Sequence, residues 1–203
     1  MPTYTLEECL LSLPVPHSST NQYFFGTRDF LSPTTDSLWQ VESGVVRTWT
    51  RTPNNQRVAL GYWGPGEILG SPLSRLNPYF MQCVTNVKVS MLSPMLLERS
   101  LDVLVSQFQQ TEHLLSILHS QPVSLRLWQF LVWLSHKFGR DVDQGRLIDL
   151  TLTHQEMAEA ISATRVSVTR ILQQLEKQGN LQRHSKQLII TSSAASSTYL
   201  PSD

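Results

Sequence analysis

The residues best suited to chemistry lie near the C-terminus, where two arginines and several hydroxyl side chains fall within residues 152–172. Thr153 and Glu156 have the spacing of a capping box, in which each side chain satisfies a free backbone N–H at a helix start. Two small residues at positions 162–163 are typical of a turn. Thr164 follows them and can cap a second helix. This stretch therefore predicts two helices joined by a tight turn.

The second helix is predicted to bury one side only. Its apolar residues recur at intervals of three and four positions, at Val168, Ile171, Leu172 and Leu175. Outside that stripe lie Arg165, Val166, Ser167, Thr169, Arg170 and Gln173. The first turns of such a helix reach base edges in the DNA major groove, where arginine binds O6 and N7 of guanine together. Taken alone, the stretch would also fit an ordinary exposed helix with two arginines.

The pattern as a whole resembles the winged helix-turn-helix of the Crp/Fnr family of bacterial transcription regulators. Within that family, the order Thr-Arg-Val-Ser-Val-Thr-Arg at residues 164–170 is most similar to the recognition helix of the cyanobacterial global nitrogen regulators. The resemblance implies a homodimer that binds double-stranded DNA at a palindromic site with guanine and thymine in each half. It also implies RNA polymerase as a partner if the protein activates transcription.

The DNA contacts implied by this resemblance fall into two groups. Arg165 and Arg170 are expected to read guanines, and the methyl groups of Val166 are expected to meet a thymine methyl. The other residues are expected to contact phosphates or to position the helix on them. These residues are Ser167, Thr169, His154, Gln155, Arg183 and Lys186.

Composition places the chain among globular proteins, with 203 residues, 40% hydrophobic and 16% charged side chains and no net charge. No stretch approaches 18 apolar residues, and the N-terminus lacks a charged region followed by an apolar run. A cytoplasmic protein without a membrane partner is therefore expected. The charges are unevenly distributed, because residues 164–190 carry five cations against Glu176 alone. Such clustering is typical of a face that contacts phosphates.

Cysteine usage and motif content argue against a cofactor or an enzyme. Cys9 and Cys83 are too few for a disulfide framework, and no close pair indicates a metal site. An iron–sulfur sensor of the Fnr type would need more thiolate ligands. No nucleophile–base pair or phosphate-transfer motif is present. A further alternative is an interaction protein that keeps the fold without binding DNA, which the intact Arg165 and Arg170 argue against.

Residues 22–92 alternate in short β-rich runs with turn signals between them, which predicts a small antiparallel barrel or roll. The runs are residues 23–25, 37–41, 44–50, 57–60 and 87–92. Residues 53–56 have the residue types of a hairpin connection. With the helical stretches that follow, the predicted fold class is α+β, with a β-roll like that of cyclic-nucleotide-binding domains at the N-terminus.

Two stretches carry the likeness to the cyclic-nucleotide-binding fold. Residues 41–47 are similar to its strand–turn–strand, and residues 63–70 are similar to the turn that cradles the ligand. The glycines permit close backbone approach, and free N–H groups beside Glu67 could hold an anion or a ribose. The effector pocket expected from this alignment is formed by Gly66, Glu67, Ile68, Leu69, Tyr79 and Gln107.

The cationic side chains that this family uses to hold its effectors are missing. The residues that would bind cyclic AMP or 2-oxoglutarate align with Asn77, Pro78, Tyr79 and Gln107. A dianion would lose its charge-assisted hydrogen bonds there, so neither molecule is expected as the effector. Either side chains such as Tyr79, Phe80 and Met81 fill the pocket and the protein is constitutively competent, or the pocket takes an uncharged or less acidic ligand.

From Ser93 the pattern becomes helical, with Pro94 at the first helical position and no Gly or Pro before Pro122. Positions that alternate by four and three residues form a heptad seam of Leu97, Leu101, Leu104, Phe108, Thr111, Leu115 and Leu118. This seam predicts a parallel dimer helix. An amphipathic helix packed on its own barrel is the alternative.

Four segments result: an effector-domain-like β-roll at residues 1–92, a dimerisation helix at 93–120, a winged helix-turn-helix domain at 121–192 and a disordered tail at 193–203. In the third segment, a helix is expected to end at Phe138 and to be followed by a strand at residues 147–152. A hairpin wing is expected around Lys186. The tail is rich in Ser, Ala and Thr, which is typical of disorder.

Overall fold

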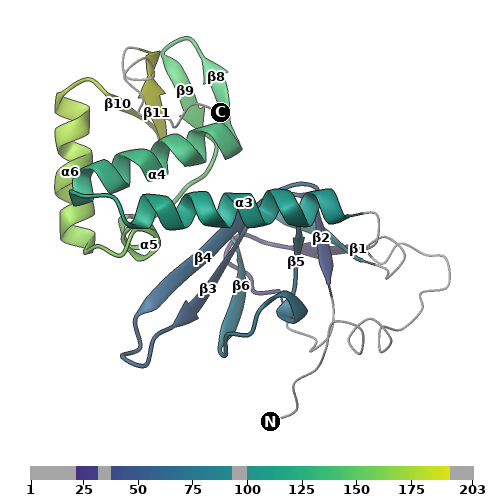
Figure 1. The fold of residues 1–203 in the computed structure, drawn as a ribbon. Coiled ribbons are helices and arrows are strands. Elements are labelled where there is room, and N and C mark those ends of the chain that lie inside the picture. The colour runs from purple at the N-terminus through teal and green to yellow at the C-terminus, as the bar shows by residue number, and fades with distance from the viewer. Residues whose placement is uncertain (1–21, 32–37, 93–99, 193–203) are drawn as a thin grey trace. The chain divides into compact units, whose positions relative to one another are not determined.

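The computed structural model describes residues 22–31, 38–92 and 100–192 (Figure 1). The chain divides into two compact units, residues 1–113 and residues 114–203. The predicted α+β class is confirmed, with β-sheets in the first unit and helices with a small sheet in the second. The predicted tail at residues 193–203 and seam residue Leu97 lie outside the described residues. The segment borders at 92/93 and 120/121 remain predictions.

The N-terminal unit is built from two antiparallel sheets. Their strands are β1 (Gln22–Phe25), β2 (Trp39–Ser43), β3 (Val46–Arg51), β4 (Arg57–Trp63), β5 (Ile68–Leu69), β6 (Tyr79–Cys83) and β7 (Val87–Met91). One sheet has the order β1-β7-β2-β5 and the other has the order β4-β3-β6. All five predicted runs form strands. Two further strands were not predicted: β5, which is only two residues long, and β6, which lies in the stretch interpreted as a ligand-binding segment.

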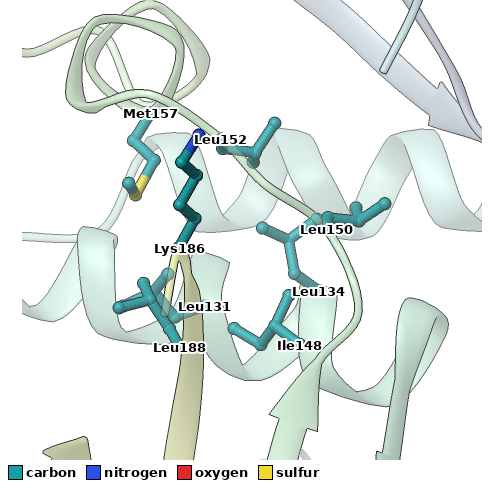
Figure 2. A pocket seen from close by; sticks show the side chains of 8 residues that line it. All are labelled: Leu131, Leu134, Ile148, Leu150, Leu152, Met157, Lys186 and Leu188. Atoms are coloured by element: carbon teal, nitrogen blue, oxygen red, sulfur yellow. The ribbon is translucent and has the colours of Figure 1, made fainter. Parts of the chain in front are cut away.

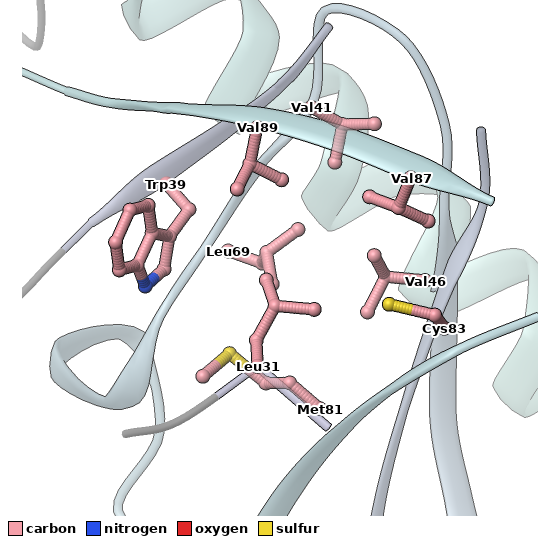
Figure 3. Packing of buried hydrophobic residues seen from close by; sticks show 9 residues of the cluster. All are labelled: Leu31, Trp39, Val41, Val46, Leu69, Met81, Cys83, Val87 and Val89. Atoms are coloured by element: carbon pink, nitrogen blue, oxygen red, sulfur yellow. The ribbon is translucent and has the colours of Figure 1, made fainter. Parts of the chain in front are cut away.

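The core of this unit is formed where the strands of both sheets turn apolar side chains toward one another, as Figure 3 shows. The cluster consists of Leu31, Trp39, Val41, Val46, Leu69, Met81, Cys83, Val87 and Val89. Alternation along β7 explains its part in the core, because Val87 and Val89 point inward while Lys88 is partly exposed. Tyr79 and Trp63 pack against the cluster from its edge.

The glycine-rich turn before β5 is held by β2. The Gly66 N–H donates to the Val41 carbonyl at 2.8 Å, and the Val41 N–H donates to the Glu67 carbonyl at 2.9 Å. Gly66 has φ +86°, a left-handed conformation that glycine adopts without steric cost. The turn is therefore an extension of the sheet, and its backbone groups are engaged within the protein.

Helix α3 (Leu101–Leu118) packs on the roll through one side. Leu104 contacts a small buried cluster of Leu38, Ile68 and Leu92. Leu101, Phe108 and Leu115 are 63%, 64% and 55% exposed, respectively. The predicted seam is therefore divided, because Leu104 is part of the roll's own packing while its neighbours in the seam remain open. Val105, outside the predicted seam, is also 56% exposed.

The C-terminal unit combines three helices with one four-stranded sheet. Its elements are α4 (Val123–Phe138), β8 (Gly139–Val142), β9 (Gly145–Ile148), α5 (His154–Ala160), α6 (Arg165–Lys177), β10 (Leu181–His184) and β11 (Gln187–Thr191). The sheet order is β10-β11-β9-β8. The helix end at Phe138 and the wing hairpin are confirmed. The core includes Leu127, Phe130 and Leu131 on α4.

One strand prediction in this unit is wrong in its bounds. The strand expected at residues 147–152 ends at Ile148, and the Asp149 N–H donates instead to the Phe138 carbonyl at 3.0 Å. Leu150 is buried although it lies beyond the strand. The apolar residues after Ile148 are therefore buried without pairing to a neighbouring strand, which explains the wrong prediction. Strand β8 was missed because its sequence, Gly-Arg-Asp-Val, has no β-rich character.

Candidate nucleic-acid interface

Helix α5 begins as the capping pattern predicts. The Glu156 N–H donates to Thr153 Oγ1 at 3.1 Å, and the Thr153 N–H donates to Glu156 Oε2 at 2.7 Å. The helix ends after two turns at a tight connection, where Ser162 has φ +51° and the Ala163 N–H donates to the Ala158 carbonyl at 2.9 Å. The predicted helix–turn–helix is therefore confirmed in its backbone (Figure 1).

Helix α6 buries the predicted stripe and leaves its other side open. Val168, Ile171 and Leu172 are buried, and the Thr164 side chain accepts from the Ser167 N–H at 3.0 Å. Arg165 and Arg170 are exposed, and their guanidinium groups make no hydrogen bond or ion pair with another described residue. Val166 is 78% exposed, the largest value among the exposed large hydrophobic side chains in the described part of the chain. A single exposed apolar side chain is common on a protein surface, so the position of Val166 between the two arginines, and not its exposure alone, makes it a candidate contact residue.

Two hydroxyl side chains on α6 are already used inside the protein. Ser167 Oγ lies 2.9 Å from the Oγ1 of the cap residue Thr164. Thr169 Oγ1 donates to the Arg165 carbonyl at 2.9 Å, one helical turn back. Both side chains are partly buried. The expected role of Ser167 and Thr169, positioning the helix on phosphates, stays a prediction.

His154, the first residue of α5, joins the two helices. Its Nδ1 lies 2.8 Å from Thr169 Oγ1. The pKa of His154 lies below the ordinary value of 6.5, first because of burial and then because of the positive charges of Arg183 and Arg165; Glu176 opposes this shift. The imidazole therefore lies within the electrostatic reach of two of the residues expected at the DNA.

The wing is attached to α6 by an ion pair. Arg183 Nε on β10 donates to Glu176 Oε1 on α6 at 2.5 Å. This contact, which the sequence analysis missed, orients a residue that was expected to contact phosphate. Gln155 is exposed on α5, with its amide 3.2 Å from Glu159 Oε1. Arg183 and Gln155 both keep part of their surface open to solvent.

Lys186 lies at the tip of the wing, next to Ser185 with φ +57°. Its side chain lines a pocket together with apolar residues of α4, β9, α5, β11 and the segment after β9. Those residues are Leu131, Leu134, Ile148, Leu150, Leu152, Met157 and Leu188 (Figure 2). The methylene stem of Lys186 covers apolar surface while the residue as a whole stays exposed, the usual arrangement for a long cationic side chain.

Arg126 supports the interface from within and was not assigned a role from the sequence. It is only 8% exposed. Its Nη1 donates to the Ile161 carbonyl at the end of α5 at 2.9 Å, and its Nε donates to the Ser120 carbonyl before α4 at 3.2 Å. The sequence could have indicated this role, because Arg126 is a single arginine among apolar residues of α4. Arg126 therefore holds the C-terminal end of α5 against the start of α4.

Of the residues expected to form an effector pocket, Gln107 contacts the segment 66–69, and the polar side chains there bond within the protein. Ile68 and Leu69 are buried in β5. Gln107 on α3 accepts from the Ile68 N–H at 3.1 Å and donates to the Ile68 carbonyl at 2.8 Å. Glu67 Oε2 accepts from the Gly64 N–H at 2.5 Å. These contacts connect the glycine-rich turn to α3 and give each polar side chain an internal role.

Tyr79 is a partly buried residue of the roll that bonds to Thr48. Burial raises the pKa of Tyr79 to about 12, against the lowering effect of a hydrogen bond to the Thr48 side chain. The Trp63 indole N–H also donates to Thr48 Oγ1, at 2.9 Å. Gly61 is tightly packed, because a Cβ there would lie 2.4 Å from the Trp63 ring. Tyr79 and Trp63 therefore share Thr48 as a hydrogen-bond partner, and both pack against the core cluster.

The described residues contain no cluster of metal ligands, no reactive thiol and no helix that could span a membrane. Within residues 22–31, 38–92 and 100–192, no group of three or more His, Cys, Asp or Glu side chains is arranged to hold a metal ion. Burial, followed by the charge of Asp29, raises the pKa of Cys83 to about 12, which keeps its thiol protonated and unreactive. None of the described helices is long and apolar enough to cross a membrane.

Comparisons with known proteins agree with this geometry. The Crp-like helix-turn-helix domain model matches residues 125–195. The chain is 36% identical to the regulatory protein CysR of Synechococcus elongatus over 180 residues, which cover 87% of this chain and 85% of that protein. It is 34% identical to the global nitrogen regulator of Nostoc sp. over 147 residues, or 72% of this chain and 61% of that protein.

The fold of most of the chain has solved counterparts. A CRP-family transcriptional regulator from Thermus thermophilus superposes with a TM-score of 0.73 and 21% sequence identity, over 85% of this chain and 93% of that one. The named relatives and structural neighbours are transcription regulators and not enzymes. The chain therefore belongs to the Crp/Fnr family of transcription regulators.

Proposed function

We propose that this regulator acts as a homodimer that reads a palindromic DNA site through the N-terminal turns of α6. The observation that carries the proposal is the open side of α6, where Arg165, Val166 and Arg170 stand exposed without internal partners among the described residues. A guanidinium without an internal acceptor keeps all its donors for an external one. Family membership makes DNA that external partner.

The base readers are Arg165 and Arg170. Each arginine has the donor geometry for a bidentate contact to guanine, and Val166 offers methyl groups to a thymine. The supporting contacts go to phosphates and come from His154, Gln155, Arg183 and Lys186. Ser167 and Thr169 position α6 through their contacts to Thr164 and His154. Each half-site then contains guanine and thymine, and two-fold symmetry repeats it.

Dimerisation uses the open stripe of α3. Leu101, Phe108 and Leu115 are more than half exposed, and they recur with the spacing of a heptad seam. The half-buried Leu104 contributes less to this seam than its neighbours because it also packs on the roll. In the dimer the two α6 helices would enter successive major grooves, about one helical turn of DNA apart. RNA polymerase is a further partner if the dimer activates transcription.

The effector pocket of the roll has lost the cations that the family uses for anionic effectors. No arginine occurs in the sequence between Arg75 and Arg99. Gln107, at one aligned position, has its amide engaged by Ile68. Tyr79, at another, is partly buried and bonds to Thr48, which also accepts from Trp63. These contacts support the constitutively competent alternative over an uncharged ligand, and they argue against both cyclic AMP and 2-oxoglutarate.

A selection from random DNA duplexes tests the proposal. The wild-type protein should enrich a two-fold symmetric site with guanine and thymine in each half. The Arg165→Ala variant should relax base preference at one symmetric pair of positions and keep the rest of the site. An asymmetric consensus would refute the assignment of readers. Failure to enrich any sequence would instead favour an interaction protein that keeps the fold without binding DNA.

A further inference from the structure

The contact between His154 and Thr169 determines which imidazole nitrogen carries the proton. Thr169 Oγ1 lies 2.9 Å from the Arg165 carbonyl oxygen, which can only accept a hydrogen bond. The single hydroxyl proton of Thr169 is therefore directed to that carbonyl. His154 Nδ1 lies 2.8 Å from the same hydroxyl oxygen, so Nδ1 must be the donor in that contact. The neutral imidazole is consequently the Nδ1–H tautomer.

This tautomer has a consequence for any anion near the ring. With the proton on Nδ1, the Nε2 atom of neutral His154 presents a lone pair and repels a phosphate oxygen. Only the imidazolium carries an N–H on both nitrogens. A phosphate contact through Nε2 thus requires protonation of the ring. The neutral Nε2–H tautomer would instead donate to the phosphate without taking up a proton.

The charges around His154 keep the ring neutral in the free protein. From β10 the Arg183 guanidinium acts on it, and from α6 the Arg165 guanidinium does so; both lower the pKa of His154 together with burial. Glu176 on α6 acts in the opposite direction, and its carboxylate is shared with Arg183. On α5 itself, Glu156 is engaged by the Thr153 cap. A DNA phosphate between these cations would reverse the balance.

We propose that His154 is a proton-linked phosphate contact and that Thr169 is the positioning residue that makes it so. This inference rests on the proposed function, because it needs DNA at the face shared by His154, Arg165 and Arg183. The protein takes up one proton per half-site on binding DNA. Affinity therefore rises as the pH falls through the interval between the higher pKa of His154 in the complex and its lower pKa in the free protein.

The test is the affinity for a selected duplex, measured by fluorescence anisotropy from pH 5.5 to 8.5 at constant ionic strength. In the wild type, the association constant should fall as the pH rises, by up to about tenfold per pH unit for each His154 that contacts a phosphate. His154→Gln should flatten this dependence, since the amide donates without titrating. His136→Gln is the matched control, because His136 is exposed on α4 of the same unit and should leave the profile unchanged.

Variants of Thr169 separate positioning from direct contact. Thr169→Ser keeps the hydroxyl and should keep the pH profile. Thr169→Val removes the acceptor for Nδ1–H, so the ring is free to adopt the Nε2–H tautomer and the pH dependence should weaken. Nitrogen-15 NMR of the free full-length protein reports the tautomer directly. It should show Nδ1–H in the wild type and a shift toward Nε2–H in Thr169→Val.

Each outcome decides the inference. An Nε2–H tautomer in the wild type overturns the geometric argument, whatever DNA does. DNA binding with the same affinity at every pH overturns the proton linkage and leaves the proposed function intact. Absence of DNA binding to every duplex at every pH rejects the proposed function and this inference together.

Discussion

Inside the β-roll, the hydroxyl of Thr48 bonds to Trp63 and Tyr79, whereas on α6 the guanidinium groups of Arg165 and Arg170 bond to no other described residue. The two regions are the two places where the family resemblance predicts a ligand. A buried polar group must be partnered, because leaving it without a hydrogen bond costs about 1–3 kcal/mol. A group partnered inside the protein has fewer donors and acceptors for a ligand. The difference teaches that the guanidinium groups of α6 keep their donors for an external partner, whereas these polar groups of the roll are engaged inside the protein.

The largest expected effect concerns the two sides of α3, where Gln107 faces inward and Phe108 outward. Phe108→Ala combined with Leu115→Ala removes four apolar side chains from a symmetric dimer. Truncation of a buried large apolar side chain costs about 2–5 kcal/mol, so we expect monomers. Light scattering measures this directly. His113→Ala, exposed on the same helix, is the control, and an unaltered dimer in the double variant would reject the seam.

The next effect removes an engaged polar group of the roll. Gln107→Leu leaves the N–H and the carbonyl of Ile68 without their partner, at a cost of about 1–3 kcal/mol for each group. The urea midpoint at fixed protein concentration should fall accordingly. Gln109→Leu, the same change at an exposed position of α3, should leave it nearly unchanged. Equal midpoints for the two variants would mean that this contact does not stabilise the roll.

The converse experiment is made on the open region. Arg170→Ala should lose about 1–3 kcal/mol of discrimination against a wrong base in each half-site. Because Arg170 is exposed, the free energy of unfolding should change by less than about 0.5 kcal/mol. Competition binding with single-base variants of the site, alongside urea denaturation, measures both quantities. A large loss of stability would show that Arg170 has a structural role instead.

A smaller effect is expected at the wing. Lys186→Ala should weaken binding to all sequences alike, and the slope of log K against log salt should become shallower by about 0.9, the contribution of one phosphate. Lys186 also covers apolar side chains, so a slight loss of stability accompanies the change. The control is Lys177→Ala, which changes an exposed lysine of the same unit at the C-terminal end of α6. A changed base preference in Lys186→Ala would contradict a phosphate contact.

The smallest effect is the contribution of His154 to stability. Its pKa in the folded protein lies below the ordinary value, so the unfolded chain binds more protons in the interval between the two pKa values. Stability from this residue is therefore full above pH 6.5 and declines as the pH falls below it. Thermal melts from pH 8 to pH 5 should show a shallower decline for His154→Gln than for the wild type. A steeper decline for His154→Gln than for the wild type would mean that the folded-state pKa of His154 is raised and not lowered.

The helix–turn–helix was predictable because its determinants are local. The cap of Thr153 on Glu156 and the cap of Thr164 on Ser167 span three residues. The buried stripe of α6 recurs within a few turns. Contacts of this range depend on residue types and spacing, which a sequence displays directly. For the same reason the predicted strands of the roll were found where alternation was clear, whereas β5 and β6 of the roll and β8 of the C-terminal unit were not predicted.

Tertiary structure alone decided which polar groups remain available. Gln107 meets Ile68 across 39 residues, Arg126 meets Ile161 across 35, and His154 meets Thr169 across 15. Such contacts depend on how whole elements pack, and a spacing of three or four residues carries no information about them. The sequence by itself determined the local framework and the residue types on the open side of α6. Packing determined that Gln107 is engaged by Ile68, that Leu104 belongs partly to the roll, and that His154 Nδ1 meets the hydroxyl of Thr169, because most buried polar groups find partners wherever the fold brings them.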